Sequence, residues 1–301
     1  MKTNTLMKTL HSRAYPVQTA RGRRSLAIGR WIAIGAACWL LPSAQASLLW
    51  QESFDYGSTL PLAGQGTWAV TTNSAFITVG SVSLTYSGLA DVWPLGYSAR
   101  TAGLSATSAS YTYSPFTTSA SSGVVYTSFL LDFYGTVAGG NYTFMGLLPY
   151  SASGPGNGGN FNNTYDPCDL ISRSSSGAVQ LGIRTLGQGT TYATPTLALG
   201  STSLIVMKYD FDAKKASLFI NPDLNSGEPA TPNASSTGTT AAASLGQFYV
   251  RVGGNNQGPY MVDSVRVGTT WADVIVVPEP SVLALLGLGV LGLGLARRFR
   301  R

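Results

Sequence analysis

Histidine and cysteine are almost absent from this sequence. Its only histidine is His11, and its two cysteines are Cys38 and Cys168. The chain after residue 11 therefore cannot hold a Ser-His-Asp triad, a Cys-His pair or a histidine-ligated zinc or copper site. Because Cys38 lies in an N-terminal segment that we expect to be removed, Cys168 would then have no partner for an intrachain disulfide. The hydrophobic core must stabilise such a fold.

Charged side chains are also scarce, at 11% of the residues, and the formal net charge of +6 is unevenly placed. Seven of the 19 basic residues lie in residues 1–46, and four more lie among the last five residues. The central part of the chain is therefore slightly acidic, which does not favour a nucleic acid partner. Its apolar content argues against disorder.

The N-terminal segment has the order of parts of a signal peptide. A basic region precedes the apolar stretch 31–41, and Ala44 and Ala46 form a small-x-small cleavage pattern. The stretch is short for a membrane anchor, which is the alternative. We expect signal peptidase to remove residues 1–46. The basic region contains Arg21, Arg23, Arg24 and Arg30.

The C-terminal segment, residues 277–301, has three parts in a fixed order. Pro278, Glu279 and Pro280 precede an apolar run over residues 282–296, and the chain stops at a basic cluster. Fifteen helical residues cover about 22 Å, so the run spans a bilayer only with its flanking residues and snorkelling arginines. We expect a transmembrane helix with the arginines on the cytoplasmic side. The cluster consists of Arg297, Arg298, Arg300 and Arg301.

This order of parts resembles the PEP-CTERM sorting domain of Gram-negative bacteria. The resemblance covers about the last 25 residues and implies recognition by an exosortase, a membrane-embedded protease. It also implies export across the inner membrane, transient anchoring in the membrane, and delivery to the cell surface or the extracellular medium, often together with exopolysaccharide.

Residues 47–276 alternate apolar and polar side chains with a period of two, which predicts strands. Residues 210–214 are typical of a hairpin connection, and residues 271–274 of one helical turn. We predict one all-β domain, an antiparallel two-sheet β-sandwich of jelly-roll type, with long loops at 151–163 and 225–244. The clearer strands are expected at 124–133, 142–148, 178–184, 203–209, 216–221, 248–252 and 260–267, and weaker ones near 48–54, 68–70, 76–79 and 111–113.

Several motifs of this domain resemble LamG-like, concanavalin A-like jelly rolls. They are residues 208–212, 217–223, Glu228 with the proline after it, 262–268 with 271–273, and the opening 52–56 followed by 64–68. The resemblance implies the fold and a surface role more than an activity.

Catalytic carboxylates are not evident. Retaining glycosidases need two carboxyl groups about 5–5.5 Å apart, and laminarinase-like members of the fold place theirs in a Glu-x-Asp-x-Glu motif. Glu52 and Glu228, the two glutamates of the domain, lack that neighbourhood, and Asp210 and Asp212 lie at the expected turn. We expect no enzyme, with a glycoside hydrolase or lyase as the alternative.

Two kinds of ligand site remain as hypotheses. Loop aromatics could bind an extracellular polysaccharide: Trp93, Tyr97, Tyr150, Tyr165 and Tyr192. Asp55, Asp263 and Asp273 could bind calcium, the one cofactor considered, if the first and last strands pair. Each of these side chains has a structural alternative as a packed aromatic or a turn-capping aspartate. We expect a non-enzymatic cell-surface or extracellular-matrix protein, with a purely structural matrix protein as a further alternative.

Overall fold

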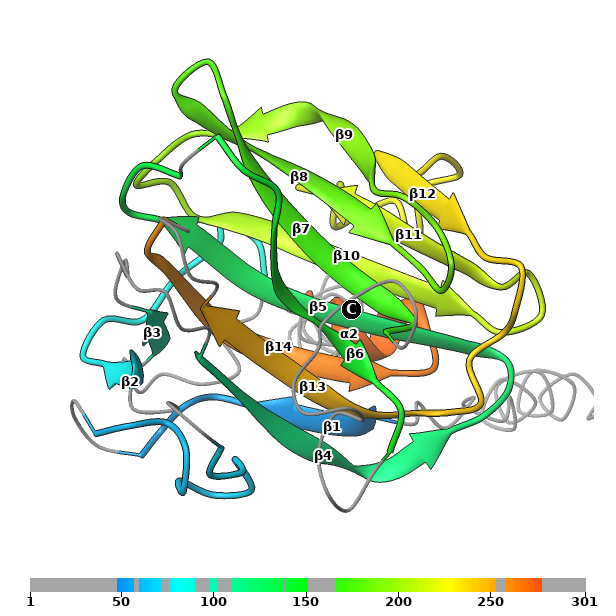
Figure 1. Cartoon of the computed structure of the whole chain (residues 1–301), viewed down its shortest axis with the longest axis horizontal. Coiled ribbons are helices and arrows are strands. Elements are labelled where there is room, and N and C mark those ends of the chain that lie inside the picture. The colour runs from blue at the N-terminus through cyan, green and yellow to red at the C-terminus, as the bar shows by residue number, and fades with distance from the viewer. Residues whose placement is uncertain are drawn as a thin grey trace, which may run out of the picture. The chain divides into compact units, whose positions relative to one another are not determined.

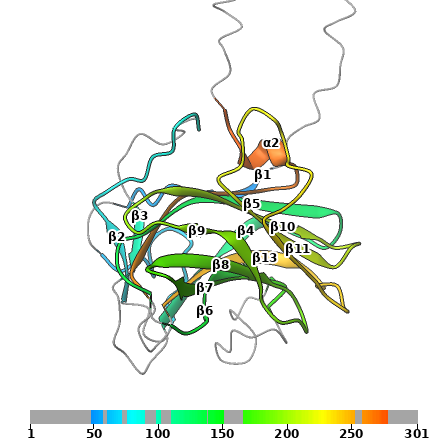
Figure 2. The same ribbon diagram turned by 90° about the horizontal axis from the view of Figure 1, so that it is seen from above.

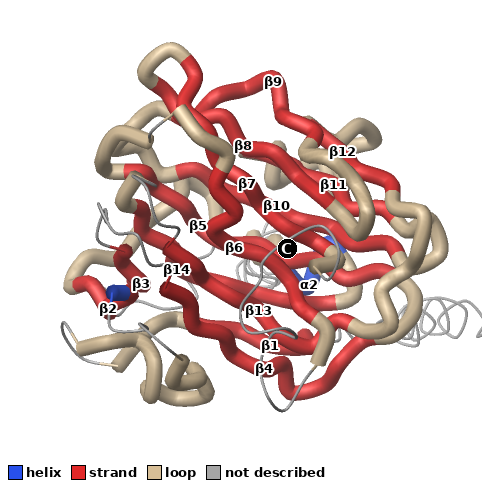
Figure 3. Tube along the Cα trace, viewed as in Figure 1, coloured by secondary structure: helices blue, strands red, loops and turns tan. Residues whose placement is uncertain are grey.

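The computed structural model describes residues 48–56, 60–71, 76–89, 98–101, 110–137, 139–150, 166–252 and 258–277. The predicted signal peptide and its cleavage residues Ala44 and Ala46 lie outside these ranges. So do the sorting motif Pro278–Pro280, the predicted transmembrane helix and the terminal arginines. The described residues form two antiparallel sheets packed face to face, with little helix (Figures 1 and 3). The predicted two-sheet β-sandwich is confirmed.

The eight-stranded sheet brings together both ends of the domain. Along this sheet the strand order is β12-β11-β10-β5-β14-β3-β2, and β1 also pairs with β14. Neighbouring strands are antiparallel throughout. The strands are β1 (Leu48–Glu52), β2 (Ile77–Gly80), β3 (Ser98–Thr101), β5 (Val124–Phe133), β10 (Ser203–Asp210), β11 (Lys215–Ile220), β12 (Ala234–Thr237) and β14 (Tyr260–Gly268).

The six-stranded sheet has the order β4-β13-β6-β7-β8-β9. Four of its strands, β6 to β9, follow one another in the chain as a meander, while β13 inserts between β4 and β6. The strands are β4 (Ser110–Ala120), β6 (Tyr142–Leu148), β7 (Cys168–Ser175), β8 (Ala178–Arg184), β9 (Thr191–Leu197) and β13 (Leu245–Val252).

The main hydrophobic core lies between the two sheets. Its aromatic side chains come from both layers: Trp50 of β1 lies 5.8 Å from Phe248 of β13, measured between ring centroids, and Phe133 of β5 lies 5.5 Å from Phe144 of β6. Fully burying one such side chain is worth about 1.5–3 kcal/mol. This core, with no disulfide among the described residues, holds the sandwich together.

A second, smaller core covers the outer face of the eight-stranded sheet. The short helix α2 (Trp271–Val274) packs there, on the side away from the six-stranded sheet (Figure 2). Outward-facing residues of β5, β10 and β11 meet residues from three segments outside the sheets: 84–89, Leu224 and 271–277. The domain therefore continues its packing up to Val277.

The prediction of strands was correct where apolar alternation is strong and wrong in several weaker regions; β3, β7 and β9 fall where no strand was predicted. Strands β5, β6 and β8 coincide with the predicted ranges, and the hairpin turn at 211–214 is confirmed by the pairing of Asp210 with Lys215. Residues 68–70 form no strand, because Trp68 turns back to donate its backbone N–H to Gln65. The predicted loop 225–244 contains β12, which pairs antiparallel with β11 although its sequence, Ala-Ser-Ser-Thr, carries no strand signal.

Candidate functional site

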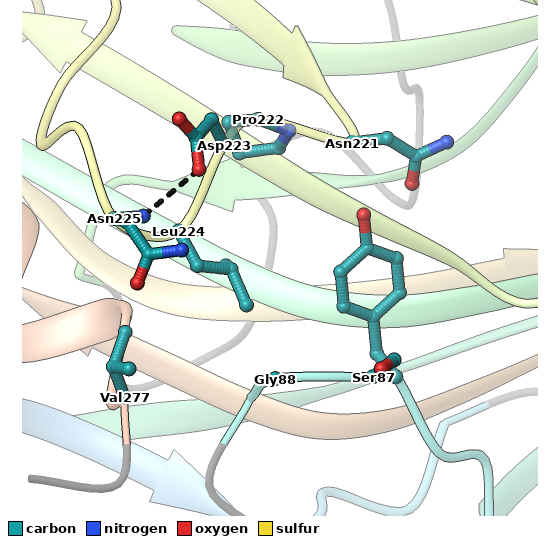
Figure 4. A pocket seen from close by; sticks show the side chains of 9 residues that line it. Ser87, Gly88, Asn221, Pro222, Asp223, Leu224, Asn225 and Val277 are labelled. Atoms are coloured by element: carbon teal, nitrogen blue, oxygen red, sulfur yellow. Dashed lines mark hydrogen bonds between the residues drawn. The ribbon is translucent and has the colours of Figure 1, made fainter. Parts of the chain in front are cut away.

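A pocket of about 510 Å³ opens on the outer side of the eight-stranded sheet. Two loops face each other across it, and the C-terminal segment of the domain reaches its edge (Figure 4). Most of the lining is polar. The lining residues are Tyr86, Ser87, Gly88, Asn221, Pro222, Asp223, Leu224, Asn225 and Val277.

The first loop is a tight turn over residues 86–89. The backbone N–H of Leu89 donates to the carbonyl of Tyr86 at 3.2 Å, and Gly88 at the third position has φ +85°. Glycine suits this position because L side chains rarely adopt such a φ. A Cβ on Gly88 would also lie 3.2 Å from Leu224 of the facing loop. The turn thus brings the two walls of the pocket close together.

Asp263 fixes the chain that leads into this turn. Its Oδ2 accepts hydrogen bonds from the backbone N–H of Leu84 and the hydroxyl of Ser83, both at 2.8 Å. The β-bulge in β14 places it there: Ser264 has φ +53° and donates its N–H to Oδ1 at 2.6 Å. Burial raises the pKa of Asp263 to about 6. The hydrogen bonds from Leu84, Ser83 and Ser264 offset part of this rise.

The second loop follows β11 and begins at Asn221, whose φ is +49°. Its N–H donates to the Leu204 carbonyl at 2.8 Å, and its Oδ1 accepts the Leu204 N–H at 2.9 Å, so the loop starts from a fixed point. Further on, Asp223 accepts the Asn225 N–H at 3.0 Å (Figure 4). This backbone donor lowers the pKa of Asp223, so its exposed carboxylate is ionised at neutral pH.

The third part of the pocket is Val277, held by the segment before it. Helix α2 begins with a capping box between Thr270 and Asp273. The carbonyl of Val274 accepts the Ser128 hydroxyl at 2.7 Å, and the carbonyl of Asp273 accepts Arg266 Nε at 2.9 Å. These bonds dock the segment on the sheet, and Val277 packs against the second core.

The lining suits a ligand rich in hydroxyl groups. Asn225 offers both a donor and an acceptor, and the Asp223 carboxylate is a strong acceptor. Burial raises the pKa of Tyr86, so its phenol stays protonated and can donate. An anionic ligand would meet the negative charge of Asp223. Sequence reasoning missed this site, although the Asn-Pro-Asp run after a strong strand and the nearby Asn225 mark a polar turn.

The predicted glycan-binding aromatics lie elsewhere. Tyr150, 57% exposed, follows β6 and lies against Gly246. Tyr192 of β9 is half-buried beneath the guanidinium of Arg173, whose Cζ lies 3.6 Å from the ring centroid. Neither lines the pocket. Trp93, Tyr97 and Tyr165 lie outside the described residues, so their role stays a prediction.

The three aspartates proposed for calcium have separate surroundings. Asp263 binds the 83–84 segment, Asp273 accepts the N–H groups of Thr269 and Thr270, and Asp55 is exposed. Strands β1 and β14 do pair, as that hypothesis required. Among the described residues, no group of three His, Cys, Asp or Glu side chains is placed to hold a metal ion. Calcium binding stays a prediction without a ligand set.

Both glutamates of the domain belong to structural contacts. Buried Glu52 accepts hydrogen bonds from Phe54 N–H at 2.6 Å, Tyr56 Oη at 2.5 Å and Trp68 Nε1 at 2.8 Å. It thereby links the two halves of the opening motif, residues 52–56 and 64–68.

Glu228 makes structural contacts on the outer face of the eight-stranded sheet. It pairs with Lys208 Nζ at 2.7 Å and accepts a hydrogen bond from the hydroxyl of Tyr126 at 2.6 Å.

Cys168 is fully buried, and burial raises the pKa of its thiol. Glu52, Glu228 and Cys168 do not line the pocket.

Comparison with known protein families identifies the C-terminal segment of the chain. Residues 276–301 match the PEP-CTERM protein-sorting motif, so the chain carries a signal for export and exosortase-mediated processing. None of the curated protein sequences matches the chain. Within the described residues, no helix has the length and apolar character needed to cross a bilayer.

Solved structures similar to the domain are distant. They include a Trypanosoma rangeli sialidase with 2,3-difluorosialic acid (10% identity, TM-score 0.39), which covers 70% of this chain. The chain spans only 30% of that sialidase. A Lotus tetragonolobus seed lectin has 13% identity and a TM-score of 0.36, covering 64% of this chain and 96% of the lectin.

The exoplasmic/lumenal domain of VIP36, in a Ca²⁺/Man3GlcNAc-bound form, has 10% identity and a TM-score of 0.40. That match covers 74% of this chain and 93% of the VIP36 domain. At these scores and identities, the likeness assigns neither ligand nor activity to this chain.

Proposed function

We propose that this chain is an exported, non-enzymatic surface protein that binds neutral glycan in the pocket between residues 86–88 and 221–225. The sorting motif carries the export, and the pocket carries the binding. The single observation behind the glycan proposal is the lining: a tyrosine, two asparagines and an ionised aspartate converge on one cavity at the surface.

The size and chemistry of the cavity support a sugar ligand. Small-molecule pockets usually enclose about 300–1,000 Å³, and this one has about 510 Å³. Sugar hydroxyls can donate to Asp223 and exchange hydrogen bonds with Asn225. A uronic acid or sulfated sugar would bring a second negative charge close to Asp223, so neutral sugars are favoured.

The absence of catalysis is part of the proposal. Glu52 and Glu228, the strongest acid candidates in the sequence, are committed to contacts away from the pocket. A single carboxylate, Asp223, lines the pocket, whereas most glycosidases use a pair. We therefore expect binding of polysaccharide without release of reducing ends.

The test is a pull-down of residues 47–277 on insoluble cellulose, chitin and starch, with and without EDTA, followed by an assay for reducing sugar. Asn225→Ala and Asp223→Asn should each weaken retention roughly tenfold, the usual cost of one or two hydrogen bonds to a polar or charged group. Asn141→Ala is the matched control, since Asn141 is an exposed asparagine away from the pocket.

Each other outcome of this pull-down would support a different alternative. Retention that is lost in Tyr150→Ala or Tyr192→Ala but kept in Asn225→Ala would move the site to the six-stranded sheet. Loss with EDTA would support calcium. Release of reducing ends would support a hydrolase. A folded protein retained by no polysaccharide would support a purely structural matrix protein and contradict the proposal.

A further inference from the structure

Arginines gather on the six-stranded sheet, although acidic residues outnumber basic ones in residues 47–277 as a whole. The strands of this sheet carry Arg173, Arg184 and Arg251 against one carboxylate, Asp169. Asp166, buried just before β7, is a second. The strands of the eight-stranded sheet, by contrast, hold equal numbers of basic and acidic residues. An excess of positive charge therefore belongs to the six-stranded sheet.

All three arginines face away from the core between the sheets. Side chains alternate along a strand, and each arginine lies an odd number of positions from a core residue of its own strand. The outer face of the six-stranded sheet therefore carries the excess of positive charge. The core residues that set this alternation are Leu170 of β7, Ile183 of β8 and Val250 of β13.

Arg173 differs from the other two arginines in its partners. Arg184 pairs with Asp169, and Arg251 lies close enough to Asp169 for the two charges to attract. Arg173 forms no ion pair with a carboxylate in the part of the chain that the structure describes. Its side chain is partly exposed, so a ligand in solution can reach it.

The guanidinium of Arg173 is nevertheless held in one orientation by the two neighbouring strands, β8 and β9 (Figure 1). Its Nε donates to Gln180 Oε1 at 2.9 Å, and Gln180 Nε2 donates to the Ala193 carbonyl at 2.6 Å. Its Cζ lies 3.6 Å from the ring centroid of Tyr192. That ring lies across Gly182, where a Cβ would come within 2.8 Å of it. The side chain is thus preorganised without a counter-charge.

This arrangement leaves the outer edge of the guanidinium for a ligand. Because Nε is bonded and one face lies on Tyr192, the two terminal amino groups, Nη1 and Nη2, remain side by side as a planar fork. A carboxylate matches such a fork with two parallel hydrogen bonds. The ring face that Arg173 covers cannot stack on a sugar, so Tyr192 acts here by positioning the arginine.

The surroundings favour an acidic polysaccharide over an acidic peptide. The exposed Thr196 of β9 lies opposite Gln180 and offers a hydroxyl for sugar hydroxyl groups. Pro195 interrupts β9, the edge strand of this sheet, and has no N–H to pair with an added peptide strand. Arg184 and Arg251 extend the positive charge across the face, which suits a polymer with a charge on every repeat.

We propose that the outer face of β7, β8 and β9 binds a polyuronate, with Arg173 holding one sugar carboxylate through Nη1 and Nη2. This site is separate from the pocket on the other sheet, where Asp223 disfavours anionic sugars. The domain then has one outer side for neutral glycan and one for acidic glycan, so a single copy can link two kinds of polysaccharide.

The experiment measures binding of the full chain, kept in a non-ionic detergent with EDTA, to immobilised polysaccharides. The probes are polygalacturonate, polymannuronate and polyglucuronate, each compared with its methyl ester, which keeps the backbone and removes the charge. We expect at least one polyuronate to bind, and its methyl ester to bind at least tenfold more weakly. This comparison needs no variant of the protein.

Three variants tie the binding to Arg173. Arg173→Gln should weaken polyuronate binding roughly tenfold, the usual cost of a hydrogen bond between charged groups. Arg173→Lys keeps the charge but lacks the fork, and should weaken binding at least threefold. Lys214→Gln is the matched control: it removes one positive charge at the exposed β10–β11 turn and should stay within twofold of wild type. Unchanged thermal unfolding midpoints show that the variants are folded.

Several outcomes would overturn the inference. They are the binding of no polyuronate, equal binding of acid and methyl ester, and wild-type affinity in Arg173→Gln. Wild-type affinity in Arg173→Lys would remove the carboxylate fork. Equally tight binding of poly-L-glutamate would point to an acidic peptide instead.

The pocket variant Asn225→Ala separates this inference from the proposed function. It should bind polyuronate like wild type, whereas a loss would place the acidic ligand in the pocket and overturn the inference. Arg173→Gln should in turn keep its retention on neutral polysaccharide. Failure of every neutral polysaccharide to bind would overturn the proposed function and leave the polyuronate site standing.

Discussion

The two sheets share one core but differ on their outer faces. The outer face of the eight-stranded sheet is mainly apolar, apart from the Lys208–Glu228 pair, and is covered by α2 and the 84–89 segment, with Leu130 and Val206 buried beneath them. The outer face of the six-stranded sheet carries charged and aromatic side chains, centred on Asp169. Cys168 and Leu170 on either side of Asp169 point into the core, so Asp169 points outward. The first face is built for docking a segment, the second for pairing charges.

A row across four strands forms the polar face. In neighbouring strands, Tyr249, Gly146, Asp169 and Arg184 lie opposite one another. The ring of Tyr249 crosses Gly146, where a Cβ would lie 2.8 Å from it, and its hydroxyl donates to Asp169 at 2.6 Å. Arg184 Nε donates to the other carboxylate oxygen at 3.1 Å. Since Asp169 is fully buried, its ionised form depends on these partners.

The largest expected effect comes from breaking that row. Asp169→Asn should lower the free energy of unfolding by about 3–5 kcal/mol, because Arg184, with a side chain only 17% exposed, then lacks its counter-charge. Urea denaturation followed by tryptophan fluorescence measures the change. The control is Asp212→Asn at the exposed β10–β11 turn, which should stay within about 0.5 kcal/mol of wild type. If both variants lost less than about 1 kcal/mol, the row would not stabilise the sheet as argued.

Asp263, a buried carboxylate on the outer side of the eight-stranded sheet, should make the free energy of unfolding depend on pH. Burial raises the pKa of Asp263 from 3.8 to about 6. Between these values the folded chain keeps a proton that the unfolded chain has released, so the free energy of unfolding falls as pH rises from about 4 to 6 and levels off above. The loss is about 3 kcal/mol over this window.

Asp263→Asn removes this titration, and the difference between wild type and variant across pH 4–7 isolates it from other carboxyl groups. A wild-type-minus-variant difference that does not change with pH would show that Asp263 keeps an ordinary pKa in the folded state.

The sequence predicted the sandwich because its core strands alternate clearly. Val124–Phe133 and Tyr142–Leu148 have the apolar, β-branched and aromatic content of strands buried in a core, and their bounds were correct. Strand β12 was missed because its four residues, Ala-Ser-Ser-Thr, have no such signal and depend on β11 for pairing. Strand β7 was missed for a similar reason: its outward Asp169 and Arg173 interrupt the apolar pattern.

The candidate site was harder to predict than the fold. Tyr86, Asp223 and Val277 are far apart in the chain and meet only because the second core docks three segments on one face. Periodicity reports which residues a sheet buries, but not which loops cover its outer side. The polar turn at residues 221–225 could have been predicted from its Asn-Pro-Asp run. The facing turn at 86–89 could not, because its position depends on the β-bulge that places Asp263.

The docking of the C-terminal segment gives the smallest predicted effect and the one closest to the site. Trp271 packs edge-to-face on Phe219 and Tyr126, with ring centroids 5.3 and 6.0 Å apart. Trp271→Ala should lower the free energy of unfolding by about 2–3 kcal/mol, less than for a fully buried tryptophan because this one is only half-buried. Val70→Ala, at a position 77% exposed, is the control and should change stability by less than about 0.5 kcal/mol.

The same variant should also loosen Val277 and so weaken the pocket. We expect amide hydrogen exchange to quicken at Val274 and Ile275 while β6 and β7 of the other sheet keep their protection. Faster exchange in both sheets would mean that α2 belongs to the global fold. In that case the apolar face would not be a separately docked layer.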